Sequence, residues 1–121
     1  MARDPKKLEV FHQAHRLALE IYVLTAGFPP AERFGLQSQL RRAAVSIPCN
    51  IVEGCVRRGV RDYQRFLDIA LGSAAEVRYL LELTDSLQLL QGERLDQCRE
   101  CSDHLFRALQ KLHTAVSSMS N

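Results

Sequence analysis

Apolar residues recur at steps of three and four along four segments of the 121-residue chain, the spacing of one face of an α-helix. Residues that end helices separate these segments, at Gly27-Phe28-Pro29-Pro30, at 54–59 and at Gln91-Gly92. Because short connections make successive helices antiparallel, the pattern predicts an all-α fold, an antiparallel up-down-up-down four-helix bundle. A single domain is expected to cover residues 1–121, with helices at about 5–26, 36–58, 61–90 and 93–116.

The apolar stripes of two segments are simple, and those of the other two are doubled. Single core stripes run from Leu36 to Cys55 and from Leu95 to Val116. The segment 5–26 instead carries neighbouring stripes that begin at Leu8 and Val10, and together they exceed the apolar arc of a surface helix. Either such helices are unusually central, or part of their apolar surface meets another subunit. The predicted oligomer interface comprises Val10, Leu17, Ile21, Leu24, Tyr79, Leu83 and Leu90.

Proline 48 lies inside the second predicted helix. Proline lacks an amide donor and clashes with the carbonyl one turn earlier, so we expect a helix kink at Pro48 and Asn50. The side chain of Asn50 or Ser46 is expected to satisfy the backbone groups that Pro48 frees. The alternative is that this polar stretch binds a ligand or partner.

Arginine is concentrated in the middle of the chain. The net charge is only +2, but residues 33–65 hold seven arginines against Glu53 and Asp62, a net +5. Arginine suits phosphate because its planar guanidinium donates bidentate hydrogen bonds. The alternatives are a solvated face or ion pairs with the acidic C-terminal half. The predicted nucleic-acid-binding residues are Arg41, Arg42, Arg57, Arg58, Arg61 and Arg65.

Other residue patterns argue against catalysis and cofactors. Cys98, Cys101 and His104 step around a helix by about 60° each, so one tetrahedral metal site would not collect all three. Glu9 and His12 match one half of a di-iron motif whose second half is missing. No phosphate-binding loop or nucleophile elbow is present. We expect no enzyme activity, no cofactor and no metal. Without a membrane span or a signal peptide, we expect a cytoplasmic protein.

The run from Gln39 to Gly54, QLRRAAVSIPCNIVEG, and the stretch RFLDIALGSAAE from Arg65 to Glu76 resemble a known bacterial family. Its members are four-helix-bundle proteins encoded in intervening sequences of large-subunit ribosomal RNA genes. The resemblance covers nearly the whole chain and implies a ring-like homopentamer. It also links the chain to accessory proteins of diversity-generating retroelements, which are basic pentamers that bind nucleic acid and a reverse transcriptase.

These observations predict a non-enzymatic homo-oligomeric scaffold that binds RNA or DNA backbone through arginines. A ring would repeat a modest local charge and strengthen its field. Two other classes of function stay open. One is a protein-interaction adaptor whose arginines meet an acidic partner protein, and the other is a bundle that holds a metal or small molecule.

Overall fold

The structure, a computed structural model, describes residues 3–119, and these form four long helices. They are α1 (Glu9–Thr25), α2 (Leu36–Cys55), α3 (Val60–Ser86) and α4 (Glu93–Met119). Single turns of 3-10 helix, η1 (Pro5–Lys7) and η2 (Pro30–Glu32), precede α1 and α2. No strand occurs among the described residues. The predicted all-α fold is therefore confirmed.

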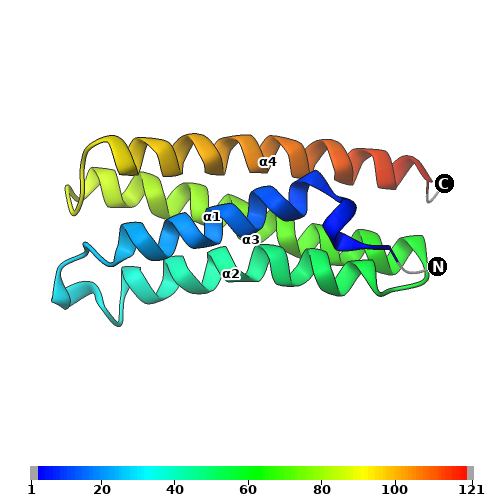
Figure 1. Cartoon of the computed structure of the whole chain (residues 1–121), viewed down its shortest axis with the longest axis horizontal. Helices are drawn as coiled ribbons and strands as arrows, with labels where there is room; N and C mark the ends of the chain where they lie inside the picture. The colour runs from blue at the N-terminus through cyan, green and yellow to red at the C-terminus, as the bar shows by residue number, and fades with distance from the viewer. Residues whose placement is uncertain (1–2, 120–121) are drawn as a thin grey trace.

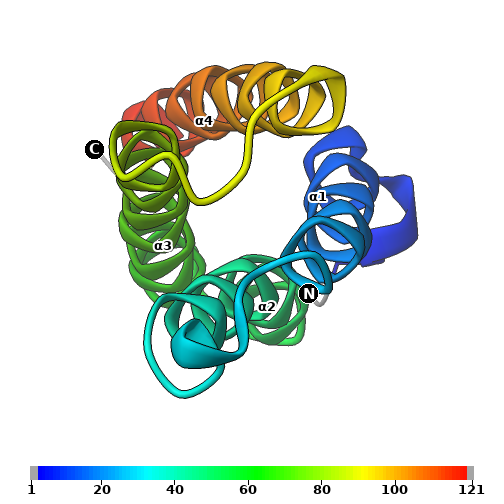
Figure 2. The same cartoon turned by 90° about the vertical axis from the view of Figure 1, so that its left-hand side faces the viewer.

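Successive helices run antiparallel and lie side by side (Figure 1). Viewed from one end, they form a square in which each helix contacts its sequence neighbours and α4 closes against α1 (Figure 2). The α1–α2 and α3–α4 connections lie at one end of the bundle. The α2–α3 connection lies at the other end, together with η1 and the last turns of α4. The two ends thus bring together different parts of the chain.

Three helix boundaries differ from the predicted ones, each for a local reason. The backbone of Leu8 is extended (φ −99°, ψ 123°), which separates η1 from α1 and makes α1 begin at Glu9. Helix α2 ends at Cys55, so Arg57 and Arg58 lie in the α2–α3 connection. Helix α3 ends at Ser86, because Gln88 adopts a left-handed backbone with φ 57°. Gly92, with φ 110°, then leads into α4 and uses the conformational freedom of glycine.

The core is formed by the single stripes of α2 and α4, by one face of α3, and by the second of the two stripes on α1. Leu17 and Ile21 are fully buried, and Val10 and Leu24 are 7% and 3% exposed. The prediction that Val10, Leu17, Ile21 and Leu24 contact another subunit is therefore wrong, because these side chains fill the centre of their own bundle. Of the predicted interface residues, Tyr79 is exposed, while Leu83 and Leu90 are half-buried.

Helices α2 and α3 approach closely near the α2–α3 connection. A Cβ atom at Gly54 would lie 3.0 Å from Cβ of Phe66 and 3.2 Å from Cδ1 of Tyr63. Glycine therefore lets the first turns of α3 lie directly against the end of α2. This contact fixes the aromatic rings over which the arginines of the connection are placed. Within residues 3–119, no helix is both long and apolar enough to cross a membrane.

Candidate nucleic-acid interface

The six arginines predicted to bind nucleic acid fall into two groups at opposite ends of α2. Arg57, Arg58, Arg61 and Arg65 surround the α2–α3 connection and are called here the arginine cluster. Arg41 and Arg42 lie in the early turns of α2. At 1.5 Å per residue, Arg41 and Arg57 are separated by roughly 24 Å along the helix axis. The six therefore do not form one surface patch.

Two members of the arginine cluster are held by acids and by an aromatic ring. Arg57 donates to Oε1 of Glu53 at 3.1 Å, and its guanidinium lies 4.9 Å from the centre of the Phe66 ring. Arg65 lies 4.6 Å from the same ring, with its Nε 3.7 Å from Oδ1 of Asp62. Such cation–π contacts hold a guanidinium in place without removing its charge.

The other two members, Arg58 and Arg61, are exposed and form no ion pair with any residue of the described chain. The acids of the C-terminal half are not their partners. Asp103 accepts from Nε of Arg78 at 2.9 Å, and Asp85 pairs with Arg99 at 3.3 Å, which joins α3 to α4. Four positive charges against Glu53 and Asp62 leave the cluster cationic.

Arg3 joins the same end of the bundle, which the sequence pattern did not indicate. Its amide donates to the carbonyl of Cys55 at 2.7 Å, and its guanidinium lies 3.9 Å from the Tyr63 ring centre. A single arginine before the first helix gives no periodic signal. Only the packing of the η1 segment against the α2–α3 connection places this additional charge there.

Arg41 has a structural role at the other end of α2. Its Nε donates to Oγ1 of the buried Thr25 at 2.8 Å, and Nη2 lies 3.4 Å from the carbonyl oxygen of Tyr22. Its guanidinium also lies 4.4 Å from the Tyr22 ring centre. These contacts join α2 to the end of α1. Arg42 is exposed, with no ion pair in the described part of the chain.

Pro48 and Asn50 lie within a helix that is continuous from Leu36 to Cys55. The side-chain amide of Asn50 donates to the carbonyl oxygen and to Oγ of Ser46, at 2.8 and 3.0 Å. Oγ of Ser46 is 2.9 Å from Oγ of Ser73 on α3. Proline at position 48 frees the carbonyl of Ala44. Contrary to the expectation, Asn50 does not satisfy that carbonyl, because its amide donates to Ser46. Asn50 instead holds the Ser46 hydroxyl, which makes the polar contact between α2 and α3.

An outward apolar stripe runs along α2 to its C-cap residue and was not among the predicted surfaces. Val45, Cys49, Val52 and Val56 follow steps of four, three and four, and all four are exposed. We call these residues the outer stripe. Its spacing is that of a coiled-coil seam, and this could have been read from the sequence. The partly buried Phe11 of α1 lies beside Pro48, Cys49 and Val52 in a shallow apolar groove.

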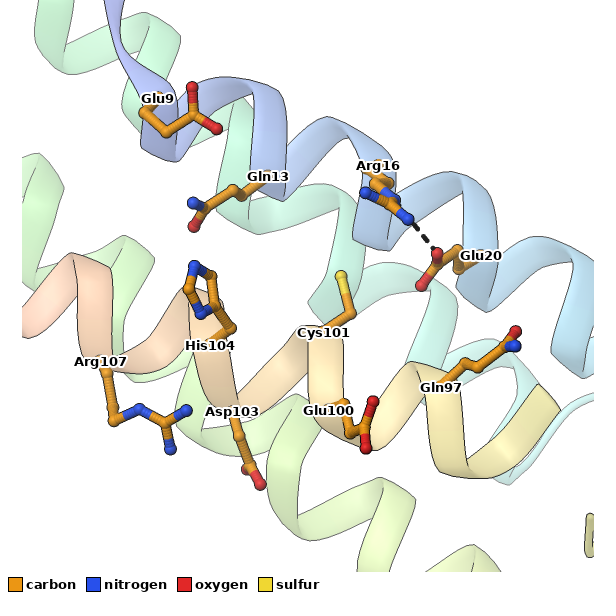
Figure 3. Close-up of a pocket in the computed structure, with 10 residues that line it drawn as sticks. All are labelled: Glu9, Gln13, Arg16, Glu20, Gln97, Glu100, Cys101, Asp103, His104 and Arg107. Atoms are coloured by element: carbon orange, nitrogen blue, oxygen red, sulfur yellow. Dashed lines mark hydrogen bonds and ion pairs between the residues drawn. The ribbon is translucent and has the colours of Figure 1, made fainter. Parts of the chain in front are cut away.

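A polar groove separates α1 from α4 and contains the residues weighed as metal ligands (Figure 3). Cys101 and His104 project toward α1, whereas Asp103 points away. Cys98 is buried in the core instead. Among residues 3–119, no three or more His, Cys, Asp or Glu side chains are grouped as metal ligands. Glu9 lines the groove, but His12 lies with its Nε2 2.7 Å from the carbonyl oxygen of Lys6.

The four cysteines should differ strongly in reactivity. Burial, reinforced by the carboxylate of Glu20, raises the pKa of Cys98 to about 12 and that of Cys101 to about 11. The thiolate is the reactive form, so both should react slowly at pH 8, and labelling of Cys101 should accelerate as pH rises toward 11. In dissociated subunits, in which Cys49 is exposed, we expect iodoacetamide to modify Cys49 first. Peptide mass spectrometry checks this order, with labelling in urea as the control; equal rates at Cys49 and Cys101 would contradict it.

Fold and surface together define a small antiparallel four-helix bundle with arginine-rich ends. The chain belongs to the 23S rRNA-intervening sequence protein family, whose sequence profile matches residues 6–111. The chain is also similar to a protein of unknown function from the S23 ribosomal protein family of Bacteroides thetaiotaomicron, solved by crystallography at 1.70 Å. The two share 25% sequence identity over 86% of this chain and 97% of the other, with a TM-score of 0.79. No curated protein matches the sequence.

Proposed function

We propose that the protein is a non-enzymatic, homo-oligomeric cytoplasmic scaffold that binds nucleic-acid backbone without reading its sequence. The arginine cluster carries this proposal. Arg61 and Arg65 are one helical turn apart, where like charges repel unless an anion joins them. Arg58 and Arg61 have no acidic partner in residues 3–119, so their charge is available to phosphate. Binding of this kind depends on releasing counterions from the nucleic acid.

The oligomeric part of the proposal rests on the outer stripe of α2. Four apolar side chains at coiled-coil spacing suit an apolar helix face on a second copy of this chain. A homopentamer is the assembly that the family resemblance implies. Repeating the arginine cluster around such a ring would multiply its field and favour association with a polyanion. Tyr79 and Leu83 on α3 would supply a second contact if each subunit meets two neighbours.

The test is a salt titration of binding to generic single-stranded and duplex RNA and DNA. For the wild type, we expect the logarithm of the association constant to fall linearly with the logarithm of the salt concentration. The variant Arg58→Ala/Arg61→Ala/Arg65→Ala should bind more weakly, and the magnitude of its slope should be smaller by roughly two to three. Fluorescence anisotropy measures both quantities. Loss of phosphate contacts should affect all four nucleic acids to a similar extent.

A matched control removes three charges elsewhere. Arg94, Arg107 and Lys111 are exposed on α4, so Arg94→Ala/Arg107→Ala/Lys111→Ala lowers the net charge equally while leaving the cluster intact. Equal losses in both triple variants would mean that total charge, not the cluster, drives binding. If wild-type protein binds no nucleic acid even at low salt, the proposal fails, and an adaptor for an acidic protein becomes the better hypothesis.

A further inference from the structure

A hollow at the α1–α2 end of the bundle combines exposed aromatic rings with arginines. Its lining includes Tyr22, Arg33, Phe34, Ser38, Arg41 and Arg42. These residues come from the end of α1, the α1–α2 connection and the early turns of α2. We call it the stacking hollow. It lies at the opposite end of α2 from the arginine cluster and is separate from it, and it shares Val45 with the outer stripe.

Phe34 is the most exposed large apolar residue of residues 3–119. It is 89% exposed, although burying a phenylalanine is normally strongly favourable. The connection that carries it is anchored on both sides. The amide of Arg33 donates to the carbonyl of Pro30 at 3.2 Å, and that of Gly35 donates to the carbonyl of Glu32 at 3.1 Å. The turn is therefore ordered, and it presents the Phe34 side chain to solvent.

The second aromatic ring, that of Tyr22, is 44% exposed and is fixed in place. The guanidinium of Arg41 lies against it and is held by the hydrogen bond to Thr25 Oγ1. A pre-positioned ring suits ligand binding because little side-chain entropy is lost when the ligand arrives. A guanidinium lies over one face of each ring, so the other face of Tyr22 and of Phe34 can contact a planar ligand.

The charge of the hollow is positive and unopposed. Arg33 lies 5.4 Å from the Phe34 ring centre, and Arg42 is exposed without an ion pair in residues 3–119. No carboxylate lines the hollow. The nearest acid in sequence, Glu32, accepts the amide of Leu36 through Oε1 at 3.2 Å, so it serves the start of α2. Cations beside exposed rings match the alternation of phosphate and base in a nucleic-acid strand.

We infer that the stacking hollow binds an unpaired base of single-stranded nucleic acid. The base stacks on Phe34, and Arg33 and Arg42 neutralise the neighbouring phosphates. In a duplex the bases are stacked on each other and offer no free face to Phe34, so the hollow distinguishes single strands from duplexes. This inference rests on the proposed function but adds a preference that the arginine cluster by itself does not provide.

The experiment uses the full chain with fluorescein-labelled oligo-dT, oligo-U and a mixed-sequence duplex. We expect Phe34→Ala to weaken binding of both single strands by about 5- to 150-fold, the usual loss of one stacking contact, and to leave duplex binding unchanged. Comparing oligo-dT with oligo-U separates DNA from RNA. A strand containing 2-aminopurine should be quenched on binding to wild type and less so on binding to Phe34→Ala.

Two control variants make the result specific. Phe34→Leu keeps apolar bulk but removes the aromatic face, so it should lose most of the single-strand affinity and the quenching. Leu87→Ala removes a comparably placed exposed apolar side chain, 54% exposed, at the α3–α4 connection, and should bind like wild type. Because Phe34 is exposed, all three variants should melt like wild type.

The outcomes separate this inference from the proposed function. Full single-strand affinity and quenching in Phe34→Ala would overturn the stacking hollow, while salt-dependent binding through the arginine cluster would stand. Equal losses for single strands and duplex would also overturn it. If Phe34→Ala dissociates the oligomer, Phe34 belongs to a contact with a protein chain and not to a base. Absence of all nucleic-acid binding in wild type would overturn both.

Discussion

Replacing Leu17 with alanine should lower the free energy of unfolding by about 2–5 kcal/mol, whereas Leu19→Ala should change it by less than about 0.5 kcal/mol. Both substitutions remove the same atoms from the same helix. Leu17 is fully buried between the helices of the bundle, and Leu19 is 57% exposed. Truncating Leu17 leaves a cavity that the surrounding core fills only in part, and truncating Leu19 leaves none.

Urea unfolding followed by far-UV circular dichroism measures the difference between the two variants. It should be repeated at several protein concentrations, because association of subunits adds to apparent stability by mass action. If Leu17→Ala dissociated subunits without destabilising them, Leu17 would belong to a subunit interface after all, and the stripe of α1 that fills the core would have to be reassigned.

Replacing Val52 with glutamate should convert the oligomer to monomers that keep their helical content. Val52 lies in the middle of the outer stripe and is 39% exposed, so a charge there is tolerated in the monomer. In an interface between identical chains, the same charge must be desolvated, and it faces other apolar side chains without an ionic partner. Burying an unpaired charge costs several kcal/mol per subunit, more than a modest helical interface provides.

Native mass spectrometry resolves the assembly state of wild type and of Val52→Glu. Gln110→Glu is the matched control, because it adds one negative charge at an exposed position of α4 and should leave the assembly intact. A Val52→Glu protein that remains assembled would place the interface elsewhere, with Tyr79 and Leu83 of α3 as the next surface to test. A wild-type monomer at micromolar concentration would reject the oligomeric scaffold.

In the arginine-rich segment, the sequence predicts which residues are candidates for binding nucleic acid, and the structure shows which of them are held by contacts within the chain. Residues 33–65 stand out by charge alone, which predicts Arg58 and Arg61 as nucleic-acid-binding residues, and both are exposed. The same pattern gives Arg41 the same role, but its Nε and Nη2 donate to Thr25 and Tyr22. Charge counting cannot detect such contacts, because the acceptors lie 16 and 19 residues away on another helix.

The sequence by itself determined the helical class, the three breaks between helices and the buried faces of α2 and α4, since each depends on local propensity and on one unambiguous periodicity. Tertiary structure decided which stripe of α1 faces the core. Periodicity fixes the angles between side chains of one helix, but not the rotation of that helix against its neighbours. Tertiary structure also brought Arg3 to Tyr63 and Arg41 to Tyr22, and it placed Phe34 in the same hollow as Tyr22. These contacts join residues that no local spacing connects, so only packing of the helices places them together.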